Sequence, residues 1–240
     1  MTEPYSLEER EAAVLARGVS KRYVGGDGTP IQVLEGVDLA VAPGESIAVI
    51  GQSGAGKSTL LHILGGLDVP SAGEVRVGTS EMARLSEDAL ARFRNEKIGC
   101  VFQFHHLLRE FSALENVAMP LLIAGTPPRQ ARERAREMLG SVGLGPRVEH
   151  TPAQLSGGEQ QRVAVARAFV HSPSILFADE PTGNLDAATG HRIVELLTEL
   201  NRELGTTLVL VTHYMELAGR ARRVIRLADG RVVSDEATGP

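Results

Sequence analysis

A glycine-rich loop between an apolar run and a helical pattern is the feature that most constrains the fold of this chain. Residues 51–58 read GQSGAGKS, directly after a strand-like apolar run at residues 46–50 and before a helical pattern at residues 59–67. Glycine lets the backbone bend so that its N–H groups can point at phosphate oxygens, and the N-terminus of the following helix adds positive partial charge. Strand, loop and helix in this order predict an α/β domain with a phosphate-binding loop. A chance glycine-rich turn would not need these flanking elements.

The loop supplies the two side chains that a nucleotide site of this kind uses. Lys57 is placed to reach the β- and γ-phosphates, and the Ser58 hydroxyl can bind Mg²⁺. The predicted phosphate site consists of Gly51, Gln52, Ser53, Gly54, Ala55, Gly56, Lys57, Ser58 and Thr59.

Two adjacent carboxylates follow a second apolar run. Residues 175–180 read ILFADE, so a buried strand would deliver Asp179 and Glu180 at its end. Asp179 would hold Mg²⁺, directly or through water, and Glu180 would polarise the attacking water. An acidic pair in an ordinary solvated turn is the alternative, and the phosphate-binding loop makes it the weaker one.

The rest of the chain is consistent with one α/β domain that carries an insertion. Alternation of apolar and polar residues at 31–41 predicts an antiparallel strand, whereas residues 85–165 are rich in helical patterns. Apolar runs at residues 175–178 and 207–212 predict buried strands. An Asp-Gly turn between two strand-like runs predicts a hairpin at residues 223–233.

These patterns predict the division of the chain. We expect a polar leader at residues 1–12, a single nucleotide-binding domain at 13–233 and a tail at 234–240. Within the domain, we expect a core formed by residues of about 13–84 and 166–233, with a helical subdomain at about 85–165.

A short stretch before a predicted helix is the most specific part of the sequence. Residues 155–162 read LSGGEQQR, and they predict a helix N-terminus with small residues and accessible N–H groups, which is an anion site. A simple capping box would explain Ser156 and Glu159, but not Gly157 and Gly158.

This stretch resembles the signature of the ATP-binding cassette (ABC) family. The resemblance implies a P-loop ATPase fold with a parallel core sheet, an antiparallel β subdomain and an inserted helical subdomain. It also implies ATP and Mg²⁺ as ligands, and a head-to-tail dimer of two copies. In such a dimer Ser156, Gly157 and Gly158, with Glu159 in the same segment, would contact the γ-phosphate bound by the other copy.

The remaining residues of the family's site occur in the expected order. The resemblance implies that Tyr23 stacks on adenine, although a core residue at a strand end is the alternative. It implies that Gln103 senses Mg²⁺ and the attacking water, and that His213 holds the γ-phosphate. A histidine alone after the strand at 207–212 would usually be structural, and the fixed order of motifs is what favours the functional role. The match extends over about residues 13–233.

Two further residues complete the comparison with the family. Asn184 and Asp186 match the loop that crosses the dimer. One residue departs from the common pattern, because Tyr214 follows the histidine where Asp is usual.

Longer stretches narrow the resemblance to one group of the family. Residues 57–68, 111–122 and 178–186 resemble a group that comprises lipoprotein-releasing ATPases, macrolide-exporter cassettes and cell-division cassettes. Residues 102–108, FQFHHLL, favour the lipoprotein-releasing members. The exporter ATPase and the cell-division regulator remain the alternatives.

The resemblance also implies partners and a location. It implies two integral membrane permease subunits that dock near Gln103 to Leu122, with the chain peripheral on the cytoplasmic side of the cell inner membrane. No apolar run approaches the ~18–20 residues of a membrane span, and the acidic N-terminus predicts no signal peptide. We therefore expect no direct lipid span.

Charge, cysteine and histidine usage exclude other classes. A net charge of −5 argues against a nucleic-acid partner. The single cysteine, Cys100, lies in an apolar run and predicts a buried structural thiol. His105 and His106 are adjacent and lack a further Cys/His cluster, so we interpret them as loop residues and not as metal ligands.

Overall fold

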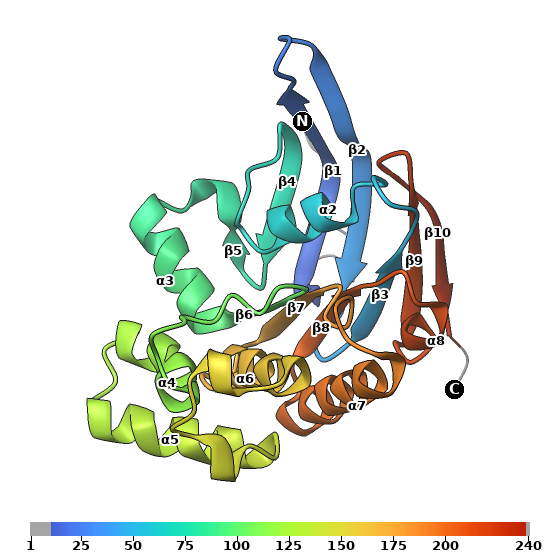
Figure 1. Ribbon diagram of the computed structural model, residues 1–240. Helices are drawn as coiled ribbons and strands as arrows, with labels where there is room; N and C mark the ends of the chain where they lie inside the picture. Colours follow the sequence, from blue (N-terminus) through green and yellow to red (C-terminus); the bar gives the residue numbers. More distant parts are fainter. Residues whose placement is uncertain (1–10, 239–240) are drawn as a thin grey trace. The chain divides into compact units, whose positions relative to one another are not determined.

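The computed structural model describes residues 11–238 (Figure 1). The strands along the chain are β1 (Val14–Val24), β2 (Pro30–Val41), β3 (Ser46–Ile50), β4 (Ala72–Val77), β5 (Ser80–Glu81), β6 (Ile98–Phe102), β7 (Ile175–Asp179), β8 (Thr207–Val211), β9 (Arg223–Ala228) and β10 (Arg231–Ala237). The α-helices are α2 (Lys57–Leu64), α3 (Glu87–Lys97), α4 (Ala113–Ile123), α5 (Pro128–Ser141), α6 (Gly157–Phe169), α7 (Ala187–Leu204) and α8 (Met215–Ala218). Short 3-10 turns lie at Met82–Arg84, Gly145–Arg147 and Pro152–Gln154.

The described residues form two compact units, residues 11–90 with 207–238 and residues 91–206. In the first unit, β3 pairs in parallel with β8 on one side and with β9 on the other. Every residue of β8 is buried, as its continuous apolar run requires. Because parallel strands end at the same edge, the loops that follow β3 and β8 leave the sheet together. This edge carries the phosphate-binding loop and His213.

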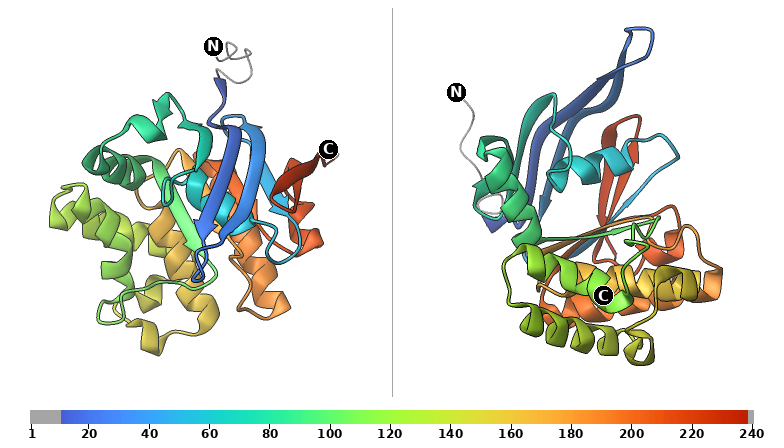
Figure 2. Two further views of the ribbon diagram at one scale, coloured as in Figure 1. Left: turned by 90° about the horizontal axis from the view of Figure 1, so that it is seen from above. Right: turned by 60° about the vertical axis from the view of Figure 1, so that its left-hand side comes forward.

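An antiparallel sheet forms the other layer of the first unit. Its strand order is β2-β1-β4-β5, and β1 and β2 run side by side in every view (Figures 1 and 2). Helix α2 contacts β2, β4 and β8, so it lies between the two layers. The helix buries four residues there, Leu60, Leu61, Ile63 and Leu64.

The second unit combines a parallel strand pair with the longer helices. Strand β6 pairs with β7 from Ile98 opposite Ile175 to Phe102 opposite Asp179. Helix α6 packs on β6 and also contacts α4, α5 and α7 (Figure 2). Gly99 permits this packing, because a Cβ at this position would lie 2.4 Å from the carbonyl oxygen of Ala168.

Several sequence-based predictions of elements are confirmed. The antiparallel strand at 31–41 is β2, and the hairpin at 223–233 is the antiparallel pair β9–β10. The helix expected at 59–67 begins two residues earlier and ends at Leu64. Most of the expected leader, residues 1–10, and the last two residues of the expected tail lie outside the described residues. Among residues 11–238, no helix combines the length and apolar character that a membrane crossing requires.

Candidate nucleotide site

The phosphate-binding loop folds around the side chain of Lys57. Lys57 is the first residue of α2, and its Nζ donates hydrogen bonds to the carbonyl oxygens of Gly51 and Gln52, each at 2.9 Å. The ammonium group is thereby held against the first two residues of the loop. A cation on a helix N-terminus, framed by main-chain N–H groups, is an arrangement that favours a polyphosphate.

Two glycines of the loop are required by close approach. A Cβ on Gly51 would lie 2.2 Å from the carbonyl oxygen of Leu227. Gly56 has φ of +97°, and its Cβ would lie 2.8 Å from the carbonyl oxygen of Val33. The tight fit and the left-handed conformation explain why this loop uses glycine at both positions.

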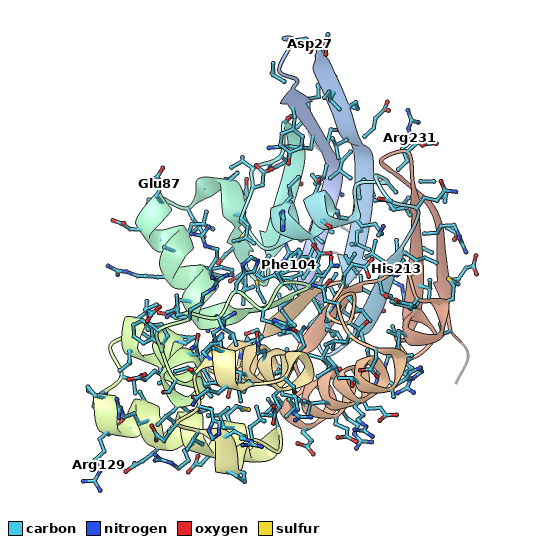
Figure 3. The ribbon with its side chains drawn as sticks, viewed as in Figure 1. Asp27, Glu87, Phe104, Arg129, His213 and Arg231 are labelled. Atoms are coloured by element: carbon cyan, nitrogen blue, oxygen red, sulfur yellow. The ribbon has the colours of Figure 1, made fainter. Side chains whose placement is uncertain are left out.

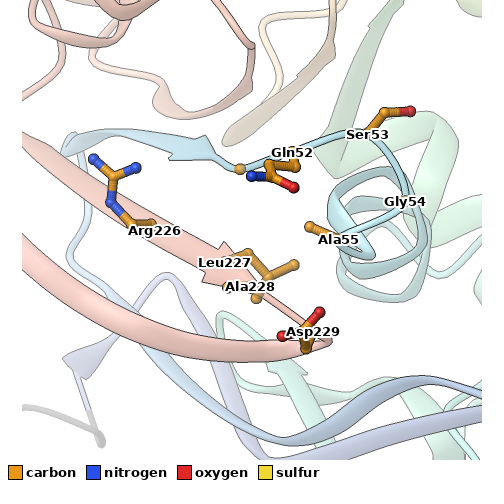
Figure 4. A pocket seen from close by; sticks show the side chains of 9 residues that line it. Gln52, Ser53, Gly54, Ala55, Arg226, Leu227, Ala228 and Asp229 are labelled. Atoms are coloured by element: carbon orange, nitrogen blue, oxygen red, sulfur yellow. The ribbon is translucent and has the colours of Figure 1, made fainter.

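A pocket of about 360 Å³ lies beside the loop, between residues 51–55 and residues 226–229 of β9 and its turn. The side chains of Gln52 and Arg226 come from opposite walls of this pocket (Figure 4). The main-chain N–H of Gly230 donates to the carbonyl oxygen of Ala55 at 3.3 Å. The β9–β10 hairpin therefore braces the first half of the loop.

Tyr23 lies near the end of β1, with 40% of its surface exposed. Its hydroxyl donates to Asp68 Oδ2 at 2.6 Å, and this hydrogen bond raises the pKa of Tyr23. Lys21 Nζ donates to Asp68 Oδ1, also at 2.6 Å. Burial acts to raise the pKa of Asp68, but the bonds from Lys21 and Tyr23 bring it below its usual value.

His213 lies in the loop after β8 and is exposed (Figure 3). Its imidazole packs against the ring of Tyr214, with 4.1 Å between ring centroids and 36° between ring planes. The main-chain N–H of Tyr214 donates to Thr212 Oγ1 at 3.1 Å, which fixes the start of this loop.

In the second unit, the two predicted carboxylates stand at the end of β7. Asp179 is its last residue, and Asp179 and Glu180 are both partly buried. Glu180 has φ of +45°, a left-handed conformation that is unfavourable for a glutamate. The turn that follows is closed by a hydrogen bond from Gly183 N to the carbonyl oxygen of Glu180. Strain at this position is typical of functional residues.

Gln103 and Asn184 are brought together by reciprocal hydrogen bonds. Gln103 Nε2 donates to Asn184 Oδ1 and Asn184 Nδ2 donates to the carbonyl oxygen of Gln103, each at 3.1 Å. Gly183 permits this contact, because its Cβ would lie 2.9 Å from Gln103 Nε2. The two loops that follow β6 and β7 are therefore tied to each other.

The predicted signature segment forms the N-terminus of α6. Ser156 caps the helix, since its Oγ accepts from Glu159 N at 3.3 Å and Glu159 Oε2 accepts from Ser156 N at 2.9 Å. The bond from Ser156 N also holds the pKa of Glu159 below its usual value. The capping box is real, but it leaves the need for the two glycines unexplained.

The neighbouring helix explains one of these glycines. A Cβ on Gly158 would lie 2.6 Å from Thr189 Cγ2, in the first turn of α7. Thr189 N donates to Asp186 Oδ1 at 3.0 Å, so Asp186 is the N-cap of α7. The signature segment and the predicted dimer loop therefore pack against each other.

Sequence reasoning missed a buried glutamine that supports this region. Gln161 is 1% exposed, and its Nε2 donates to the carbonyl oxygens of Pro181 and Phe102 at 2.7 and 3.3 Å. It connects α6 to the segments that carry Glu180 and Gln103. Its position within LSGGEQQR was visible, but its partners are 20 and 59 residues away.

The two adjacent histidines lie in a loop of the described part of the chain. His105 and His106 lie after β6, and among the described residues no three His, Cys, Asp or Glu side chains gather as metal ligands would. Cys100 is partly buried, and burial raises the pKa of its thiol to about 12, as expected for a structural cysteine.

The loop, the strand-end carboxylates and the capped glycine segment together define a class of protein. The sequence profile of the ABC transporter family matches residues 34–183. The chain belongs to this family and is an ATP-binding, ATP-hydrolysing transporter subunit.

Comparison with individual proteins narrows this class. Proteins named "Lipoprotein-releasing system ATP-binding protein LolD" are similar to the chain along most of its length. The protein of Geobacter metallireducens is 58% identical, covering 90% of this chain and 96% of the relative. That of Syntrophus aciditrophicus is 55% identical, covering 92% and 99%. These relatives confirm the resemblance to the lipoprotein-releasing group.

Solved structures confirm the expected fold class. The dimeric ATP-binding cassette MJ0796, in a post-hydrolysis state with ADP and Pi, superimposes with a TM-score of 0.87 at 41% identity. The match covers 95% of this chain and 99% of that one. The protein cbiO1 of Clostridium perfringens, described as part of the ABC transporter complex cbiONQ, matches with a TM-score of 0.84 at 28% identity, covering 95% of this chain and 89% of that one.

Proposed function

We propose that this chain powers the release of lipoproteins from the inner membrane toward the outer membrane. The observation that carries the proposal is the identity of 52–58% to proteins named for this system, over 88–94% of the chain. The exporter and cell-division alternatives share the nucleotide chemistry described below, so they differ from the proposal in their partners and not in the site.

The loop would bind the phosphates, and three side chains could hold a magnesium ion beside them. Main-chain N–H groups of residues 51–59 and the Lys57 ammonium group bind the β- and γ-phosphates. The Ser58 hydroxyl, the Asp179 carboxylate and the Gln103 amide are oxygen donors, the kind of ligand that Mg²⁺ prefers. When bound, the ion would neutralise charge that develops on the phosphates.

Hydrolysis is assigned to three side chains. Glu180 orients and polarises the attacking water, and His213 donates a hydrogen bond to the γ-phosphate. Gln103 would be a ligand of the ion and would face the water, and its bonds with Asn184 fix the position of its side chain. These groups act by position and charge, as is usual in phosphoryl transfer.

A second copy completes each site. We infer that Ser156, Gly157, Gly158 and Glu159 of one copy approach the γ-phosphate held by the other, and that Asn184 and Asp186 belong to the loop that crosses between copies. The dimeric state of the similar cassette MJ0796 supports this assembly. ATP binding would close the dimer, and hydrolysis would open it.

Two membrane subunits, of the LolC and LolE kind, would receive this motion. The segment from Gln103 to Leu122 presents apolar side chains to solvent, with Phe104 at 65%, Leu108 at 43% and Phe111 at 39% exposure. Phe104, which lies in the loop after β6, is labelled in Figure 3. Exposed apolar groups in one segment favour a protein partner. The chain would then lie peripherally on the cytoplasmic side of the inner membrane.

Capture of the closed complex tests the proposal. Tagged Glu180→Gln protein should bind ATP but hydrolyse it about 10²–10⁴-fold more slowly, so complexes with ATP should persist. We would purify it from native membranes with ATP and identify co-purified chains by mass spectrometry. Two different membrane subunits with trapped lipoprotein would support the proposal. A single kind of membrane subunit with efflux or division components would contradict it and leave the ATPase unaffected.

A further inference from the structure

Three side chains form a closely bonded group beside the predicted adenine position. Tyr23 Oη and Lys21 Nζ each donate to one oxygen of Asp68, both at 2.6 Å. Lys21 Nζ also donates to the carbonyl oxygen of Val69 at 2.7 Å and lies 4.8 Å from the centroid of the Tyr23 ring. The carboxylate thus accepts from the phenol and from a cation that covers one face of its ring.

This group differs from an ordinary surface ion pair. The side chain of Lys21 is only 12% exposed and that of Asp68 only 28%. Screening by water is therefore weaker than for exposed pairs, whose contribution is close to zero. Tyr23, in contrast, is 40% exposed and lies near the end of β1. The bond to Asp68 selects one orientation of the Tyr23 ring.

Asp68 also connects Tyr23 to the phosphate-binding loop. Helix α2 starts at Lys57, and the segment after it is fixed by bonds from Leu67 N and Asp68 N to the carbonyl oxygen of His62. The same helix therefore determines the position of the loop at its start and that of Asp68 after its end. The distance between the aromatic ring and the loop is set through α2.

The strand register places an apolar neighbour beside the ring. Tyr23 on β1 is paired with Ile31 on β2, so the two side chains share one face of the sheet. Ile31 is 51% exposed. With Lys21 over one face of the Tyr23 ring, the opposite face is the one that could receive a planar base.

We propose that Asp68 and Lys21 are positioning residues, which hold the Tyr23 ring in the orientation that stacks on the adenine of ATP. This inference rests on the proposed function of the chain, because it assumes that Tyr23 contacts the base. It predicts that the group contributes to recognition of the base and not to binding of the phosphates or to hydrolysis.

Steady-state kinetics of the full chain separate these contributions. Asp68→Ala should raise the KM for ATP roughly 3- to 10-fold, the effect of one lost hydrogen bond, with kcat unchanged. Tyr23→Phe, which keeps the ring and removes only the hydroxyl, should raise KM similarly. The variant that combines Asp68→Ala with Tyr23→Phe should have a KM for ATP no higher than that of either single variant. The Ki of magnesium tripolyphosphate, which has no base, should stay the same in all three.

Asp38→Ala is the matched control. Asp38 lies in the same sheet and accepts a hydrogen bond from Gly18 N at 2.7 Å, seven positions along β2 from Ile31, the strand partner of Tyr23. Its KM for ATP should remain that of the original chain. An unchanged KM in Asp68→Ala, or an equal weakening of ATP and tripolyphosphate, would overturn the inference. Absence of ATP turnover by the unaltered chain would instead overturn the proposed function on which it rests.

Discussion

The ring of Tyr214 is the residue-scale feature that sets this chain apart from the common family pattern. This ring packs on the imidazole of His213 with 4.1 Å between the ring centroids, at the position where the family resemblance predicts Asp. Aromatic pairs of this kind contribute about 0.5–1.5 kcal/mol beyond burial. Tyr214→Ala should therefore lower the kcat for ATP hydrolysis by roughly 2- to 12-fold, whereas Tyr214→Phe should retain it. The measurement is the steady-state ATPase rate at saturating ATP.

The comparison with His213→Ala decides how Tyr214 acts. If Tyr214 acts only by orienting the imidazole of His213, the variant with both Tyr214→Ala and His213→Ala should hydrolyse ATP no more slowly than His213→Ala alone. An additional loss in the double variant would show that the Tyr214 ring has a separate role.

Cys100 provides a pH-dependent prediction at the same scale. Burial raises its thiol pKa from 9.0 to about 12, so at pH 8 the thiolate fraction is about 1,000-fold lower than in an unfolded chain. Thiol reagents should label the native protein about 1,000-fold more slowly than the protein in urea. Above pH 9 the unfolded state loses its proton first, so the free energy of unfolding should fall as pH rises from 9 toward 12. In Cys100→Ala, the free energy of unfolding should lack this dependence on pH. Rapid labelling of Cys100 in the native protein would contradict the prediction.

Single residues could be assigned from sequence where a motif fixes their spacing. The sequence predicts roles for Lys57 and Ser58 because the loop and helix are contiguous, and both residues begin α2. The bonds of Asp68 to Lys21 and Tyr23 could not be predicted, since they join residues 47 and 45 positions apart. The same holds for Gln103 and Asn184, which are separated by 81 positions. Such partners depend on tertiary packing and leave no local pattern.

At the scale of elements, two helices of the second unit begin with the same capping box. Ser156 and Glu159 cap α6, and Ser112 and Glu115 cap α4 in the same geometry. Either serine replaced by alanine should lower the free energy of unfolding by about 1 kcal/mol. Only Ser156→Ala should also reduce ATP turnover, by roughly 10-fold or more, because it alone would lose a hydrogen bond to a charged phosphate.

Ser112→Ala, in the capping box of α4, is the control for Ser156→Ala in α6. Urea unfolding measures the loss of stability in each variant, and the ATPase rate measures the loss of turnover. Equal loss of turnover in Ser112→Ala and Ser156→Ala would contradict a direct role for the signature segment, since both would then act through stability.

Elements with a clear apolar pattern were predictable, and those without one were not. The hairpin β9–β10 and the strands β7 and β8 have turn signals or continuous apolar runs, and they occur where expected. Helix α3 buries none of its residues, so it has no apolar face for a periodicity to reveal. Its formation depends instead on acidic residues at its start and basic residues at its end.

At the scale of the whole molecule, the predicted site residues belong to both compact units. The phosphate-binding loop, Tyr23 and His213 lie in the first unit, and Asp179, Glu180 and the signature segment lie in the second. The chain leaves the first unit after residue 90 and re-enters it at residue 207. A change of pattern in the sequence predicts an insertion at about residues 85–165. The proposed dimer adds a requirement that no single chain can meet, because each nucleotide would need a signature segment from the other copy.

Association that depends on ATP follows from this requirement. Without nucleotide, the loops and signature segments of two copies have no shared ligand, so the chain should sediment near its monomer mass of 25.6 kDa. With ATP, Glu180→Gln should sediment near twice that mass, because the ligand contacts both copies and slow hydrolysis preserves it. A variant that combines Glu180→Gln with Lys57→Ala should be monomeric, because phosphate binding is weaker. A variant that combines Glu180→Gln with Ser112→Ala should remain a dimer. Sedimentation velocity distinguishes these states. A Glu180→Gln protein that stays monomeric with saturating ATP, or that dimerises equally with ADP, would contradict a dimer held together by the γ-phosphate.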